Sequence, residues 1–150
     1  MPIDYRQAES SDAPALLELM RGLQCDDPWS VPFEEVGVKA VVDQLLANPM
    51  FGEVWFVCDQ GRPIGYVVLC FDYSLEYRGR GAWIDELYIA DSHRRQGLGG
   101  SALRFAEARA SDAGARVLHL EVNRGNAAIE LYRRHGFVDH ERYLMSKDLE

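Results

Sequence analysis

The sequence predicts an α+β domain with a mixed sheet, and two observations lead to this class. The 150 residues are 47% hydrophobic, which suits one domain over residues 1–150 with a single sizeable core. Strand-like and helix-like patterns follow one another in the order β-α-α-β-β-β-α-β-α-β. Three successive strands do not fit a regular βαβ array, so the sheet is expected to be mixed.

The first third of the chain predicts one strand and two helices. Residues 3–9 have the pattern of a strand, and Asp12 is expected to cap a helix that carries Pro14 in its first turn. Apolar residues then recur at helical spacing, at Leu16, Leu19, Met20 and Leu23. A second helix is expected from Pro32 to Asn48, because Pro49 disfavours its continuation.

The middle of the chain predicts a hairpin and a further strand. Residues 53–59 and 63–71 are rich in β-branched and aromatic side chains, and the short QGR between them has the composition of a turn. Residues 82–90, AWIDELYIA, form another strand-like run.

The last third predicts helix, strand, helix and strand. A helix is expected to begin near Leu98 and to stop at Gly114, and a strand follows over 116–122. A short helix is expected from Ala127 to His135, before a last strand over 137–149.

The net charge of the chain favours some classes of binding partner over others. The formal net charge is -8, and an acidic surface repels phosphate backbones, so no nucleic-acid partner is expected and a cationic small molecule is favoured. No apolar run approaches the roughly 20 residues that cross a bilayer. The N-terminus also lacks the pattern of a secretory signal, so we expect no membrane partner.

The cysteines and histidines predict neither disulfides nor a metal site. Cys25, Cys58 and Cys70 are odd in number and form no CxxC pair, which favours a reducing, cytoplasmic location. The four histidines are scattered and form no Cys/His cluster, so no metal is expected.

The stretch HRRQGLGG, residues 93–100, concentrates glycine where a helix should begin. A helix N-terminus exposes unpaired N–H groups and carries a partial positive charge. Small residues there let an anion approach the backbone, and two arginines add full positive charges. These residues are Arg94, Arg95, Gly97, Gly99 and Gly100. The pattern predicts a pyrophosphate site, and the alternative is a tight strand-to-helix turn with glycines for close packing.

A dinucleotide ligand is disfavoured at this turn. GLGGSA, residues 97–102, matches the loose pattern GxGxx[GA]. However, the polar DSHRRQ separates it from the strand over 82–90, and more than half of the chain precedes it.

With these residues placed, the sequence resembles the GNAT superfamily of acetyl-CoA-dependent N-acetyltransferases. The signature of that superfamily is [RQ]-x-x-G-x-[GA] after a strand, here Arg94, Arg95, Gln96, Gly97, Leu98 and Gly99. A second block follows at the typical separation, with Asn126, Tyr132 and Gly136-Phe137. WIDELYI, residues 83–89, resembles the corresponding strand of diamine and polyamine acetyltransferases and their bacterial relatives.

The resemblance implies a GNAT-like fold with acetyl-CoA as co-substrate. The sheet would be twisted, with six to seven mostly antiparallel strands and about four flanking helices. The turn from Arg94 to Gly100, including Gln96 and Leu98, would hold the pyrophosphate. The backbone of Leu87, Tyr88 and Ile89 would pair with the pantetheine arm, and the Ile89 N–H would stabilise the oxyanion.

Asp85 and Glu86 are the candidates for a general base. An alkylammonium has a pKa near ~10, so an amine substrate must lose a proton before it attacks. Neighbours in a strand face opposite ways, so one of the two is expected to point away. The resemblance to polyamine-type relatives favours Asp85, and the alternative is that both are ordinary polar residues on a half-exposed strand.

Tyr132 and Asn126 complete the candidate site. The resemblance implies that Tyr132 acts as general acid or partner of the CoA thiol, although its helical spacing from Ala128 and Leu131 also fits a core position. Asn126 is expected to contact the cofactor, to cap the last helix, or to do both.

The resemblance implies direct transfer of acetyl from acetyl-CoA to a primary amine. The acidic charge favours a small cationic amine, and the resemblance suggests a homodimer. Three alternatives stay open. They are a non-catalytic acyl-CoA sensor, an acetyltransferase acting on a protein N-terminus or lysine, and a small nucleotide-binding domain.

Overall fold

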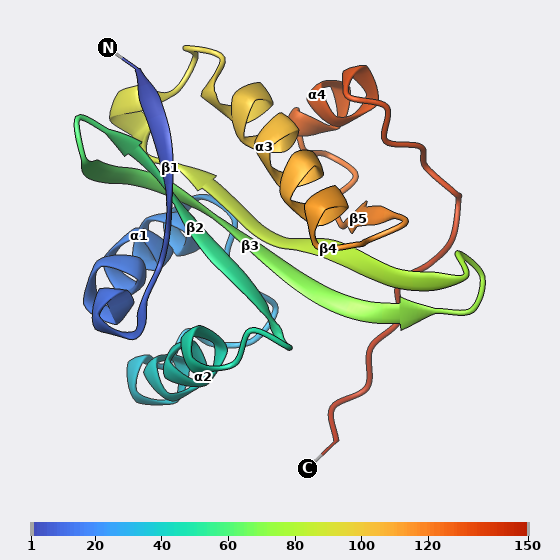
Figure 1. Ribbon diagram of the computed structural model, residues 1–150, viewed down its shortest axis with the longest axis horizontal. Coiled ribbons are helices and arrows are strands. Elements are labelled where there is room, and N and C mark those ends of the chain that lie inside the picture. The colour runs from blue at the N-terminus through green and yellow to red at the C-terminus, as the bar shows by residue number, and fades with distance from the viewer. Residues whose placement is uncertain (1, 150) are drawn as a thin grey trace.

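Five strands form one sheet within residues 2–149, which the computed structural model describes (Figure 1). The strands follow the order β1-β2-β3-β4-β5, and the first three pairings are antiparallel whereas β4 and β5 are parallel. Their bounds are β1 Ile3–Gln7, β2 Gly52–Asp59, β3 Arg62–Ser74, β4 Gly79–Ile89 and β5 Leu118–Leu120. The sheet is therefore mixed and mostly antiparallel, as the sequence predicts.

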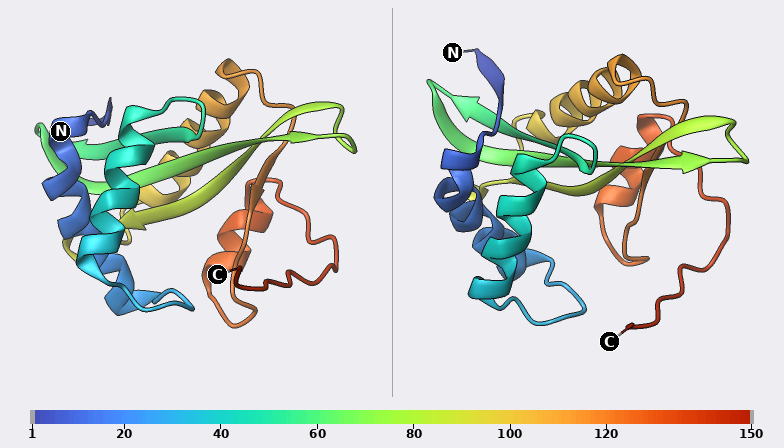
Figure 2. Two further views of the ribbon diagram at one scale, coloured as in Figure 1. Left: turned by 90° about the horizontal axis from the view of Figure 1, so that it is seen from below. Right: turned by 60° about the horizontal axis from the view of Figure 1, so that its bottom comes forward.

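Four α-helices cover the two faces of this sheet. α1, Ala13–Asp26, and α2, Glu35–Ala47, lie together on one face, and α3, Leu98–Asp112, crosses the other face (Figure 2). α4, Ala128–Arg134, lies beside α3. Two short 3₁₀ turns, Ser10–Asp12 and Asp91–His93, precede α1 and α3. The expectation of about four helices is confirmed.

The central strands β2, β3 and β4 have buried residues on both faces of the sheet, so the core has two parts. Alternating side chains of a strand point to opposite faces. Phe56 and Tyr66, both fully buried, pack toward α1 and α2, while Val67 and Leu69 pack toward α3. Each helix layer therefore has its own apolar contact with the sheet.

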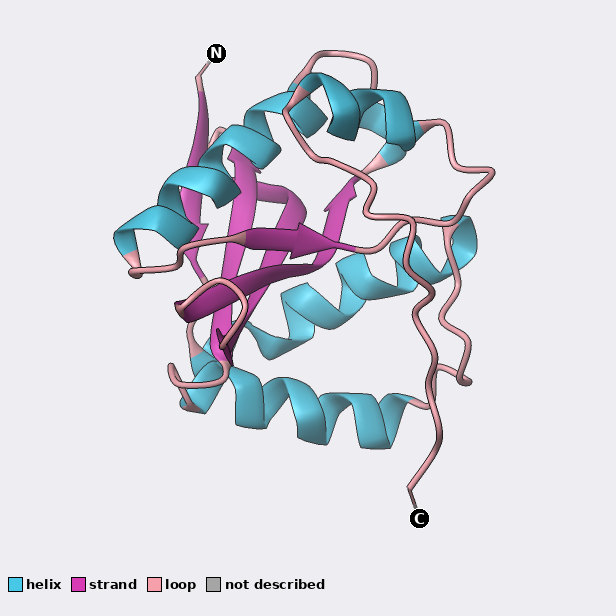
Figure 3. Ribbon diagram, turned by 90° about the vertical axis from the view of Figure 1, so that its right-hand side faces the viewer, coloured by secondary structure: helices cyan, strands magenta, loops and turns pink. Residues whose placement is uncertain are grey.

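The expectation of six to seven strands is wrong, because residues 2–149 contain five. The expected strand over 137–149 is extended chain without a partner strand (Figure 3). The expected strand over 116–122 is reduced to the three residues of β5. A strand forms only where a neighbouring strand supplies hydrogen bonds and side chains to pack against. No such neighbour is present within residues 2–149. Phe137 packs against the core, and the other large apolar residues of the segment are exposed, namely Val138, Tyr143, Leu144, Met145 and Leu149.

The starts of α1 and α2 are set by local hydrogen bonds. α2 begins at Glu35 rather than Pro32, because the Glu34 carboxylate accepts hydrogen bonds from the N–H groups of Val36 and Gly37, at 2.9 and 2.7 Å. Asp12 precedes α1 as expected, but it does not cap that helix. Its carboxylate accepts from the Glu9 N–H at 2.8 Å and pairs with Arg6 at 2.9 Å.

Two irregularities of β4 position the candidate site. Val68 of β3 pairs with Glu86, whereas the next residue, Leu69, pairs with Ile84, so Asp85 is an extra residue that forms a β-bulge. β4 also pairs with β5 only from Ala82 to Ile84. Beyond Ile84, the edge of β4 that faces β5 has no strand partner within residues 2–149.

Candidate active site

The open edge of β4 exposes main-chain groups of Leu87 and Ile89. The Ala90 N–H donates to the carbonyl of Ile64 in β3, at 2.8 Å, and main-chain groups alternate direction along an antiparallel strand. Ala90 and Tyr88 therefore direct their main-chain groups toward β3, and Leu87 and Ile89 direct theirs toward the open edge. The Ile89 carbonyl indeed accepts a hydrogen bond from Arg94 Nε at 2.7 Å.

The bulge brings Asp85 and Glu86 to the same place. Both residues line two neighbouring cavities, one of about 300 Å³ beneath α1 and α2 and one of about 140 Å³ beside Tyr132. The expectation that one of the pair must point away is therefore wrong. It assumed regular alternation, and a bulge interrupts that alternation.

Glu86 is held by two hydrogen bonds. Its Oε2 accepts from Trp29 Nε1 at 2.5 Å, and its Oε1 accepts from the Tyr66 hydroxyl at 2.9 Å. Burial raises the pKa of Glu86, the two hydrogen bonds oppose that rise, and the nearby charge of Asp85 adds to it. Both carboxylate oxygens are thus engaged with the protein.

Asp85 differs from its neighbour because its carboxylate has no such partners within residues 2–149. Partial desolvation alone raises the pKa of Asp85, and the residue is still exposed to solvent where it lines the cavities. A carboxylate with a raised pKa accepts a proton more readily near neutral pH. Asp85 is the carboxylate of this pair that is free to do so.

Tyr132 lines the smaller cavity together with Asp85 and Glu86. Leu87 from the open edge of β4 lines the same space, as do Asp27 and Glu121. Burial, with a contribution from the charge of Asp27, raises the pKa of Tyr132. Its hydroxyl therefore stays protonated at neutral pH and is able to donate a hydrogen bond.

The three glycines of the turn have different roles. Gly97 precedes α3 with φ +77°, a conformation that favours glycine, and no heavy atom would lie within 4 Å of a Cβ added there. A Cβ on Gly100 would lie 3.1 Å from His135 Nε2, and one on Gly99 would lie 3.4 Å from Leu131. Gly97 thus leaves the backbone accessible, and Gly100 fits the close-packing alternative beside His135, whereas a Cβ on Gly99 would make an ordinary contact with Leu131 of α4.

Arg94 is already engaged by the protein. It pairs with Asp26 at 2.6 Å and with Asp91 at 2.5 Å, and its guanidinium lies 5.3 Å from the centre of the Tyr88 ring. These contacts tie the turn to the end of α1. The neighbouring Arg95 is exposed, with φ +62°, and no ion pair within residues 2–149 involves it.

The remaining residues of the predicted set lie around this turn. Gln96 is exposed, and Leu98 packs into the core beneath α3. Asn126 Oδ1 accepts from the Ala128 N–H at 2.8 Å, so it caps the start of α4.

Four site residues carried no signal in the sequence. Trp29 and Tyr66 hold Glu86, and Asp27 and Glu121 line the smaller cavity. They come from three separate parts of the chain, and a lone aromatic or acidic residue in such a position is common. The packing of the α1–α2 loop against β3 and β4 brings Asp27 and Trp29 to Tyr66 and Glu86, and Glu121 arrives from the end of β5.

The geometry suits the transfer of an acyl group from an extended carrier. Unpaired N–H and C=O groups on β4 offer an added-strand pairing to an amide-bearing arm. A carboxylate and a protonated hydroxyl stand at the end of that path, where a base and a hydrogen-bond donor are needed. This fold and site define an acyltransferase.

The comparisons with known proteins agree with this class. The family model for the "Acetyltransferase (GNAT) family" matches residues 16–137. The chain therefore belongs to the GNAT acetyltransferase family, which uses acetyl-CoA, and the expectation of an acetyl-CoA-dependent N-acetyltransferase is confirmed.

Individual relatives match most of the chain. Thialysine N-epsilon-acetyltransferase from Bos taurus is 26% identical over 149 residues, which covers 89% of this chain and 83% of that protein. A "possible acetyltransferase" from Clostridium difficile 630 superposes with a TM-score of 0.87 at 14% identity, covering 100% of this chain and 99% of that one. A "predicted acetyltransferase with acetyl-CoA" from Clostridium acetobutylicum has a TM-score of 0.80 at 18% identity, covering 97% and 96%. The two structures show that the fold is shared.

Within residues 2–149, no helix combines the length and apolar character needed to cross a membrane. The same residues contain no group of three or more His, Cys, Asp or Glu side chains placed to hold a metal ion.

Replacing Arg94 should destabilise the fold, because the Arg94→Ala variant loses hydrogen bonds to Asp26 and to the Ile89 carbonyl. We expect the free energy of unfolding, measured by urea denaturation, to fall by about 1–2 kcal/mol, at the lower end for charged hydrogen bonds because the pair is partly exposed. Arg95→Ala is the control, with a change within about 0.5 kcal/mol. Equal stability of the two variants would contradict the structural role of Arg94.

Proposed function

We propose that this protein transfers the acetyl group of acetyl-CoA directly to a small primary amine. The observation that carries the proposal is the meeting of Asp85, Glu86 and Tyr132 at one cavity beside the open edge of β4. The proposal treats residues 1–150 as one acetyltransferase domain.

The cofactor is proposed to lie along the open edge of β4 and to end at the turn before α3. The main-chain groups of Leu87 and Ile89 would pair with the pantetheine arm, and Tyr88 would support them through its contact with Arg94. The pyrophosphate would sit on the backbone N–H groups from Gln96 to Gly100, with Arg95 as the free cation and Leu98 anchoring the turn. Asn126 would act beside the cofactor by holding the start of α4.

The chemistry begins with the loss of a proton from the ammonium of the acceptor to Asp85. The freed nitrogen lone pair attacks the thioester carbonyl carbon, and the oxyanion that forms is stabilised by the Ile89 N–H. The C–S bond then breaks, the thiolate leaves, and the nitrogen gives up its second proton, which reaches the thiolate through the Tyr132 hydroxyl, so that a neutral amide and the CoA thiol remain. Glu86 is proposed to position the amine, since both of its oxygens are already hydrogen-bonded.

The Tyr132 hydroxyl is proposed to donate a hydrogen bond, and then a proton, to the departing thiolate. The raised pKa of Tyr132 keeps that hydroxyl protonated over the neutral range. Tyr132 lines the same cavity as Asp85 and Glu86, which supports a proton acceptor and a hydrogen-bond donor acting on one reacting centre.

Two observations support a small cationic acceptor. The formal net charge of -8 favours the approach of cations. The bovine relative is named for the acetylation of thialysine, which points to a small amine in a related protein.

We also propose a cytoplasmic homodimer. The exposed apolar side chains of 137–149 and the single neighbour of β5 form a surface that a second copy would cover. The three cysteines are free thiols, and Cys25 is exposed, which suits a reducing compartment. A solution mass of 17.0 kDa, that of one chain, would rule out the dimer.

Purified protein should release free thiol from acetyl-CoA only when an amine is present. The measurement follows thiol release with diamines, polyamines, monoamines, amino acids, aminoglycosides and peptides as acceptors. Acetyl-CoA binding without release for any amine would instead support the non-catalytic sensor, and preference for peptides would support a protein acceptor.

Asp85→Asn should lower kcat/KM by about 10²–10⁴-fold, because the amine loses its base. Protonation of Asp85 should produce an acidic limb in the pH profile of the parent, and this limb should be absent in the variant. The folded-state pKa of Asp85 is raised, so its contribution to stability is present at low pH and is lost as the pH rises through that pKa. Because Asp85 is exposed in the free protein, the Tm of the variant at neutral pH should rise only slightly.

The matched variant for this test is Glu86→Gln, which disturbs the hydrogen bonds to Trp29 and Tyr66. It should lower Tm at neutral pH while the acidic limb of activity remains. If the limb disappears in Glu86→Gln and remains in Asp85→Asn, the assignment of the base is reversed.

Tyr132→Phe should lower kcat by about 10²-fold with little change in the Kd of acetyl-CoA, because the hydroxyl acts on the leaving thiolate. Tyr73→Phe, on an exposed side chain, serves as the control and should match the parent. Unchanged turnover and pH profile for Tyr132→Phe would show that Tyr132 is a core residue.

A further inference from the structure

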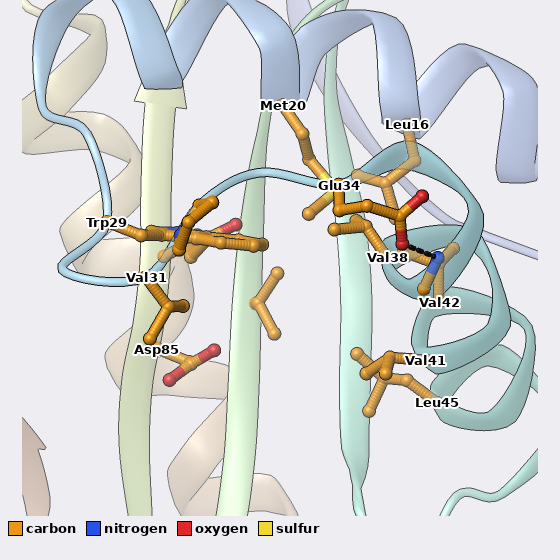
Figure 4. A pocket seen from close by; sticks show the side chains of 14 residues that line it. Leu16, Met20, Trp29, Val31, Glu34, Val38, Val41, Val42, Leu45 and Asp85 are labelled. Atoms are coloured by element: carbon orange, nitrogen blue, oxygen red, sulfur yellow. Dashed lines mark hydrogen bonds between the residues drawn. The ribbon is translucent and has the colours of Figure 1, made fainter. Parts of the chain in front are cut away.

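The larger cavity beside the site is almost wholly apolar. Its volume is about 300 Å³, and it lies between α1, α2 and the sheet. In Figure 4, Trp29, Val31 and Asp85 lie at one end, and side chains of α2 lie at the other. The apolar side chains that form the far end are Val38, Val41, Val42 and Leu45.

Three carboxylates touch this cavity, and two of them are committed to the protein. Glu34 accepts hydrogen bonds from two N–H groups at the start of α2, one of them drawn in Figure 4. Glu86 accepts from Trp29 and Tyr66. Asp85, at one end of the cavity, is left as the one carboxylate without such partners among the described lining residues.

The two cavities meet at the same side chains. Trp29, Asp85 and Glu86 line both of them. An amine that pairs with Asp85 from the larger cavity therefore faces the smaller cavity, where Leu87 and Tyr132 lie. The larger cavity is thus placed to hold the part of the acceptor that does not react.

Apolar side chains are also exposed at the mouth of the larger cavity. Val31 is 52% exposed and Val41 is 65% exposed, although both line it. Covering these exposed valine side chains with an apolar group would remove apolar surface from water and so favour binding.

We infer that the acceptor is a monoamine with an apolar body, an alkylamine or arylalkylamine, and that Asp85 takes its single ammonium. This inference rests on the proposed acetyl transfer and names its acceptor class. A second ammonium, as in a diamine, would lie among Val38, Val41 and Leu45 without a free carboxylate. A methyl group at this place would be covered by apolar side chains, whereas an ammonium would give up part of its hydration with no free carboxylate to replace it.

Two amines of equal length isolate this effect. Heptan-1-amine and hexane-1,6-diamine each have eight heavy atoms in a chain, and they differ in whether the far end is a methyl or an ammonium group. In the thiol-release assay with acetyl-CoA, kcat/KM should be at least about 10-fold higher for heptan-1-amine.

A variant should change this preference in a defined direction. Val41→Asp places a carboxylate at the end of the cavity opposite Asp85, on a side chain exposed enough for the fold to tolerate it. The ratio of kcat/KM for hexane-1,6-diamine to that for heptan-1-amine should rise by about 10-fold. Val36→Asp lies on the same helix, 78% exposed and outside the cavity, and should leave the ratio unchanged.

The outcomes separate this inference from the proposed function. Thiol release with a preference for the diamine or for a peptide would overturn the apolar-acceptor class and leave acetyl transfer intact. Equal shifts in Val41→Asp and Val36→Asp would show that general surface charge sets the preference, and would also overturn it. No release with any amine would overturn the proposed function, and the inference with it.

Discussion

A single extra residue in β4 determines how the site is built. Asp85 has no partner in β3, so the alternation of side chains is interrupted at this point. A regular strand would have sent Asp85 and Glu86 to opposite faces of the sheet. The bulge brings both carboxylates to the junction of two cavities instead, and it does so where β4 stops pairing with β5. The carboxylates, the free main-chain groups of β4 and Tyr132 therefore meet at one place.

The two adjacent carboxylates differ because their surroundings differ. Glu86 is buried and receives two hydrogen bonds, which hold its side chain in one position. Asp85 is partly desolvated without compensating hydrogen bonds, and its raised pKa reflects that cost. An ionised Asp85 that is partly desolvated and lacks hydrogen bonds slightly lowers the stability of the fold near neutral pH. Such a cost is expected where a group must exchange a proton with a ligand.

The turn before α3 combines a packing role with an accessible backbone. Gly100 leaves room for His135 at the end of α4, and Tyr132 of the same helix lies beside the smaller cavity. Gly97 leaves the start of α3 exposed, while Arg94 uses its charge to hold the turn to α1. The same short motif thus anchors three helices around the open edge of β4.

The sequence by itself determined the fold class, the order of the elements up to α4 and the residues of the glycine-rich turn. These follow from local patterns of apolar spacing, glycine and proline, which act over a few residues. The direction of Asp85 and Glu86, the partners of Glu86 and the apolar cavity were decided by the tertiary structure. They depend on the register between β3 and β4 and on contacts between residues as distant as Trp29 and Glu86. The expected strand over 137–149 failed for the same reason, since its pattern was present but a partner strand was not. A local pattern specifies what a segment is able to form, and only its neighbours in space decide what it does form.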